Sequence, residues 1–144
     1  MIEKDTVRLL DECDAGTKMG ISSIKSVLSY VSDSEFKQLL EKCMKEHENL
    51  EDEIQKRLEE FGDEGKNPNP IAKGMSWIKT NMKLAANDSD KTIASLMTDG
   101  CNMGVKSLNK YLNEYEAADE VSKDIAKRLI NLEEELTVNI RKYL

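Results

Sequence analysis

Few side chains in this sequence could do chemistry, and the first of them is the single histidine, His47. It falls in an apolar seam between Cys43 and Leu50 whose members are three or four residues apart, the spacing of one helix face. An imidazole can hold a metal ion or exchange a proton near neutral pH. Because one imidazole binds metal weakly, a metal site here would need carboxylates, and Glu133 and Asp14 are the candidates.

Glu133 is paired with His47 by its place in the sequence. It follows His47 by 86 residues and lies between Leu129 and Leu136, on a seam like that of His47. Three arrangements remain open. The two side chains form a buried or half-buried hydrogen bond that fixes the register of the helices. A difference of one residue in register places Glu133 on the surface instead. In the third arrangement, His47, Glu133 and Asp14 hold a metal ion.

The remaining reactive side chains give no recognisable site. Cys13, Cys43 and Cys101 lie far apart in the sequence, and no pair has the spacing of a metal knuckle. We therefore expect reduced thiols in a cytoplasmic protein. The sequence has no glycine-rich phosphate loop after a strand and no identifiable pair of nucleophile and base. No motif specifies a reaction.

Composition limits the class of protein. The 28 acidic residues exceed the 21 Lys and Arg and give a net charge of −7, which argues against a nucleic-acid binder and against an anionic membrane surface. Hydrophobic residues make up 39% and aromatic residues only 5%, as in helical bundles. No apolar stretch approaches the roughly 20 residues of a membrane span. The charged start lacks the apolar run of a signal peptide.

A repeat indicates how the helices are organised. Two glycines and a methionine recur after 84 residues, as Gly16, Met19 and Gly20 and then as Gly100, Met103 and Gly104. A repeat of this length predicts one helical hairpin used twice. Each glycine inside a helix costs roughly 0.5–1 kcal/mol relative to alanine. We therefore predict that the two glycine pairs mark a close backbone contact between the first and third long helices. A ligand or homodimer contact in the same groove is the alternative.

The apolar spacing predicts an all-α domain over residues 1–144. Long helices are expected at about 5–31, 34–62, 91–115 and 119–144, with Ser34 as N-cap of the second. These form hairpin 1 at about 5–62 and hairpin 2 at about 91–144. A crossover at about 63–90 contains a short extra helix at about 70–86. Because the crossover is long, the second and third long helices can run parallel, as in ferritin-like bundles.

The chain resembles ferritin-like four-helix bundles, and among them the small bacterial proteins of the rubrerythrin-like branch. The residues that carry the resemblance are Gly16-x-x-Met19-Gly20, Asn102-Met103-Gly104 and the closing segment 129–144. The resemblance implies a site for two iron ions, with one Glu from each of the first and third helices and a Glu-x-x-His pair from each of the other two.

This sequence departs from that ligand set. It offers Glu46-x-x-Asn49 in place of one Glu-x-x-His pair, has no histidine in the last helix, and has glycines near the middle of the first and third. We therefore expect neither a di-iron centre nor any other cofactor. The sequence favours a non-enzymatic binding or structural module that acts alone, as a homodimer or with an unknown protein partner. The alternative is a metalloprotein with a degenerate mononuclear iron or zinc site at His47 and Glu133.

Overall fold

The computed structural model describes residues 2–66 and 89–144, and this part of the chain is helical with no strand. Its four long helices are α1 (Ile2–Leu28), α2 (Ser34–Glu60), α4 (Ser89–Glu114) and α5 (Glu120–Asn139), followed by the short 3₁₀ helix η1 (Arg141–Tyr143). The all-α prediction is thereby confirmed. The helix expected at about 70–86 lies outside the described residues. None of the described helices is long and apolar enough to cross a membrane.

Several helix ends differ from the prediction by a few residues. The N-cap of α2 is Asp33 rather than Ser34: Asp33 has an extended backbone, and its carboxylate accepts a hydrogen bond from the amide of Phe36. A capping residue must lie outside the first helical turn, whereas Ser34 is already helical. At the other end α2 stops at Glu60, and Gly62 follows with a φ of 69°. This left-handed glycine ends the helix, as is common at helix C-termini.

The ends of the other helices also differ from the prediction. α1 stops at Leu28 instead of about Val31, because the amides of Tyr30 and Val31 bond three residues back in a tighter turn. α4 begins at Ser89, in a stretch that the sequence predicted to lie before the helix. The last helix was expected to begin at about Asp119. In the structure Asp119 is the N-cap of α5, and its carboxylate accepts from the Ser122 amide.

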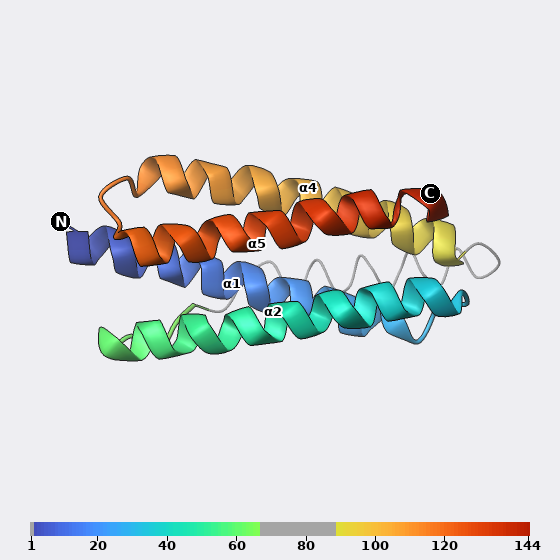
Figure 1. Ribbon diagram of the computed structural model, residues 1–144, viewed down its shortest axis with the longest axis horizontal. Coiled ribbons are helices and arrows are strands. Elements are labelled where there is room, and N and C mark those ends of the chain that lie inside the picture. The colour runs from blue at the N-terminus through green and yellow to red at the C-terminus, as the bar shows by residue number, and fades with distance from the viewer. Residues whose placement is uncertain (1, 67–88) are drawn as a thin grey trace.

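The four long helices pack as two antiparallel hairpins (Figure 1). α1 packs most extensively on α2, and α4 on α5, while α5 also contacts both α1 and α2. In Figure 1, α2 and α4 run in the same direction, and α1 and α5 run in the opposite one.

The apolar core is divided into two clusters, one towards each end of the bundle. One is built around Ile24, Phe36, Leu40, Ile93, Met97 and Ile140, and the other around Leu9, Leu10, Ile54, Leu58, Ile125 and Leu129. The predicted seam of α2 is buried along its length, from Phe36 to Leu58. On that seam Cys43 belongs to the first cluster and Leu50 to the second, so His47 lies between the two clusters.

At each end of the bundle, the turn of one hairpin is held by the first helix of the other. At one end, the Asp90 carboxylate of α4 accepts hydrogen bonds from the amides of Ser32 and Asp33, at 2.8 and 2.9 Å. At the opposite end, Asp5 of α1 accepts from the amide of Ala117 at 3.0 Å. The Thr6 hydroxyl there accepts from the amide of Asp119. These reciprocal bonds join the two hairpins.

Candidate functional site

The best-defined polar feature between the two apolar clusters is a layer to which each long helix contributes one residue. The four residues are Gly20 of α1, His47 of α2, Gly104 of α4 and Glu133 of α5. His47 Nε2 lies 2.9 Å from Glu133 Oε1, and the histidine side chain is only 1% exposed. We call this group the central polar layer. It contains both candidate metal ligands of the second and fourth long helices.

The hydrogen bonds of the histidine ring determine where its protons are. Nδ1 lies 2.8 Å from the carbonyl oxygen of Cys43, one helical turn earlier. Because a carbonyl oxygen only accepts, Nδ1 carries a hydrogen and donates it. The Cys43 sulfur lies 3.5 Å from the same nitrogen. The contact between Nε2 and Glu133 then requires one further proton, held on the imidazole or on the carboxyl group.

The surroundings of His47 favour the protonated ring. Burial by itself lowers the pKa of His47, but hydrogen bonds to Cys43 and Glu133 together with the charge of Glu133 outweigh it and raise the pKa to about 10. The pair is therefore an imidazolium paired with a carboxylate at neutral pH. A metal ion would have to displace this proton, because only a neutral imidazole is a ligand.

Glycine makes room for this pair. A Cβ atom built on Gly20 would lie 2.8 Å from His47 Cδ2 and 2.9 Å from Nε2, closer than real contacts of this kind. At Gly104 the nearest atoms belong to the Glu133 carboxyl group, at 3.8 Å. Gly20 therefore lets α1 approach the imidazole ring.

We predicted that the backbones of the first and third long helices meet at the two glycine pairs. The structure has other neighbours at these positions. The atom nearest to a Cβ on Gly16 is a side-chain methyl of Leu129 in α5, at 3.7 Å, and a Cβ on Gly100 would meet no atom within 4 Å. Three of the four glycines thus face side chains of α2 or α5, and Gly100 faces open space. The repeat drew attention to the four glycines, but it could not predict whether each would face a side chain or the backbone of a neighbouring helix.

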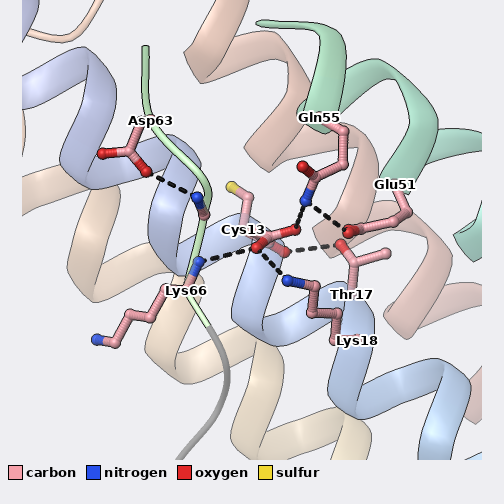
Figure 2. Close-up of polar contacts among 9 residues, drawn as sticks. Cys13, Thr17, Lys18, Glu51, Gln55, Asp63 and Lys66 are labelled. Atoms are coloured by element: carbon pink, nitrogen blue, oxygen red, sulfur yellow. Dashed lines mark hydrogen bonds and ion pairs between the residues drawn. The ribbon is translucent and has the colours of Figure 1, made fainter. Parts of the chain in front are cut away.

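Asp14 does not join the central polar layer. Its buried carboxylate accepts hydrogen bonds from Lys18 at 2.7 Å, from the Gln55 amide group at 2.7 Å and from the Lys66 backbone at 2.9 Å (Figure 2). These partners link α1, α2 and the segment that follows α2. Across residues 2–66 and 89–144, no three His, Cys, Asp or Glu side chains are grouped so that they could hold a metal ion. The third arrangement that the sequence left open, in which His47, Glu133 and Asp14 together hold a metal ion, is therefore not found in the described residues.

The Asp14 region is a second polar site, and sequence reasoning missed most of it. Gln55 donates to both Asp14 and Glu51. Burial and the hydrogen bond to Asp14 raise the pKa of Glu51 to about 8. Burial and the hydrogen bond to Asp63 raise the pKa of Asp11 to about 7. The acidic residues were visible in the sequence, but their crowding depends on the packing of α1 against α2.

The three cysteines are buried and unpaired. Burial raises the pKa of Cys13 to about 12, and burial together with the charge of Glu133 raises the pKa of Cys101. A thiol nucleophile must ionise, so these two groups are poor candidates for covalent catalysis at neutral pH.

Comparisons of the chain with protein-family models, with curated proteins and with solved structures found no match. The class of protein therefore rests on the helical architecture and on the chemistry of the two polar sites.

Proposed function

We propose that this chain is a ferritin-like four-helix bundle that serves as a non-enzymatic binding or structural module. The single observation that carries the proposal is the central polar layer. Its histidine and its carboxylate are bonded to each other, and its other two members are glycines.

The central polar layer supports this proposal because each of the four long helices contributes one residue to it, at the same depth of the bundle. Di-iron proteins of this architecture use a Glu from each of two helices and a Glu-x-x-His pair from each of the others. In this chain Gly20 and Gly104 supply no ligand from α1 and α4. The imidazole of His47 is held as the partner of Glu133 and is protonated at neutral pH. Such a pair fixes the register of α2 against α5.

The contacts between the hairpins support a duplicated hairpin. Asp33 and Asp119, the caps of α2 and α5, are 86 residues apart, as are His47 and Glu133. Two equivalent positions of a two-fold repeat meet only close to the symmetry axis. The hydrogen bond between His47 and Glu133 would then lie on the axis, with the Asp90 and Asp5 bonds placed symmetrically at the two ends.

The proposed setting is the cytoplasm, and the proposed partner is another protein or a second copy of the chain. Three free, buried cysteines are compatible with a reducing compartment. The net charge of −7 disfavours nucleic acid and anionic membranes. Sedimentation of the purified chain over a range of concentrations would distinguish a homodimer from a monomer.

Metal analysis tests the proposal directly. Protein purified without chelator, and again after anaerobic loading with Fe(II), should contain no stoichiometric iron and should develop no oxo-bridge absorption in air. Two iron atoms per chain with that absorption would refute the proposal. One iron or zinc atom per chain in the wild type that is lost in His47→Ala would support the mononuclear alternative. The variant Glu41→Gln, at an exposed site on the same helix, is the control.

A further inference from the structure

Helix α5 has an outward face that runs along almost its whole length. Six residues follow one another at steps of three and four, the spacing of one helix face, and all six are exposed. The two valines near the ends of this face are 55% and 51% exposed. We call the six residues, together with the exposed Lys127 and Glu134 beside them, the outer face of α5. The six are Val121, Asp124, Arg128, Asn131, Glu135 and Val138.

The charges near the middle of the outer face are divided by sign. Lys127 and Arg128 precede Asn131, whereas Glu134 and Glu135 follow it. The helix dipole favours cations rather than anions towards the C-terminus of a helix, yet the last turn of α5 contains no basic residue. The stability of the helix itself therefore does not explain this distribution.

Three of these charges have no ionic partner. Arg128 is held within the chain, at 2.8 Å from Glu53 and 3.0 Å from Asp124. By contrast, none of the other three charged side chains forms an ion pair with any residue in 2–66 or 89–144. They cannot pair with one another, because the cation is separated from the two anions by about 10–12 Å along the helix. The three are Lys127, Glu134 and Glu135, and all are available to another molecule.

The outer face is complementary to itself in an antiparallel arrangement. When two copies of α5 pack antiparallel with Asn131 on the two-fold axis, Lys127 of each copy lies opposite Glu135 of the other. The charge pair therefore occurs twice. A shift of one helical turn would place Asp124 opposite Glu135, where the two carboxylates repel each other. The charges thus select one direction and one register.

The exposed valines fit the same register. Val138 of one copy lies opposite Asp124 of the other copy and one helical turn from its Val121. Each end of the contact therefore brings two exposed valines towards each other, which removes apolar surface from water.

We propose that the outer face of α5 binds a second copy of this chain, which packs antiparallel against it in a two-fold dimer. The inference rests on the proposed role as a binding module and names the partner and the surface. Because the face contains only two valines, the interface is small and the charge pairs contribute much of its stability. The dimer is therefore weak, reversible and sensitive to salt.

Sedimentation equilibrium of the full chain under reducing conditions measures the dissociation constant. In buffer of about 0.02 M salt we expect a reversible equilibrium between monomer and dimer at micromolar concentrations. At about 0.5 M salt the screening length falls to about 4 Å, and the dissociation constant should rise about tenfold.

Charge reversal tests the pairing of the two copies. Lys127→Glu and Glu135→Lys each place like charges opposite one another twice, so each variant alone should raise the dissociation constant about tenfold or more. An equal mixture of the two variants should bind about as well as the wild type, because each altered position then faces an opposite charge. Lys45→Glu and Glu41→Lys, at exposed positions of α2, are the matched controls and should not change the affinity.

Cross-linking tests the position of the axis. The three native cysteines are buried, so a new exposed cysteine can be followed on its own. Asn131→Cys should form a disulfide-linked dimer under oxygen with a copper catalyst, because the axis brings the two copies of this residue together. Asn49→Cys, exposed on α2, should remain largely monomeric.

Three results would overturn the inference. One is a wild type that stays monomeric at every soluble concentration in low salt. Another is a dimer whose affinity is the same in Lys127→Glu and Glu135→Lys as in the wild type. The third is a mixture of these variants that associates no better than either alone, which refutes the antiparallel register. The metal analysis that tests the proposed function is independent of all three.

Discussion

Replacing Gly20 by alanine should destabilise the bundle, although the same change at Gly100 should stabilise it. Both glycines lie inside long helices, so each alanine gains about 1 kcal/mol in helix propensity. At Gly100 a Cβ atom meets nothing within 4 Å, and this gain is kept. At Gly20 the Cβ atom would overlap the His47 ring, at 2.8 and 2.9 Å.

The ring cannot move away freely. His47 is 1% exposed and is bonded through both of its nitrogens. Overpacking of this kind costs about 1–3 kcal/mol, and weakening a hydrogen bond to a charged group adds about 1.5–3 kcal/mol if the bond breaks. We therefore expect Gly20→Ala to lose about 1–3 kcal/mol net, while Gly100→Ala gains about 0.5–1 kcal/mol.

Urea denaturation followed by circular dichroism measures both changes, and melting temperatures should shift by about 2–4 °C per kcal/mol. A double-mutant cycle locates the cause: in a His47→Ala background the ring is absent, and Gly20→Ala should become stabilising. A Gly20→Ala variant as stable as Gly100→Ala would refute the reasoning, as would a destabilisation that persists without His47.

Three further expectations concern pH and the turns. The pKa of His47 is raised to about 10 from an ordinary 6.5. Its contribution to stability is therefore complete below pH 6.5 and is lost as the pH rises through 10. In urea titrations the wild type should lose more stability than His47→Gln over that pH range. Gly65→Ala should lower the melting temperature more than Gly62→Ala. Both glycines have a positive φ, but only at Gly65 would the new Cβ atom collide with a carboxylate, that of Asp14. Equal losses in melting temperature would contradict this. Asp90→Ala removes the acceptor of two turn amides and should cost about 1–2 kcal/mol in chemical denaturation, whereas the exposed Asp99→Ala should cost little.

The presence of long helices and the buried face of each were largely predictable, because both depend on local periodicity. The seam of α2 from Phe36 to Leu58 repeats every three or four residues, and a helix buries such a stripe whatever its neighbours are. The positions of His47 and Glu133 on two seams left three arrangements open, and the structure has the hydrogen bond between them. Helix ends were less predictable, because Asp33 and Ser34 both have capping side chains and only the backbone decides between them.

What the sequence by itself determined is that this chain forms long amphipathic helices with a single histidine on a buried face. Tertiary structure alone decided what surrounds that histidine. Gly20 faces the imidazole ring and Gly100 faces open space. Asp14 accepts a hydrogen bond from the Lys66 backbone and does not join the central polar layer. The physical reason is that periodicity fixes which face of a helix is buried, whereas the neighbours across that face depend on the rotation and depth of every other helix. A shift of one residue in the rotation or depth of one helix would change all of these neighbours.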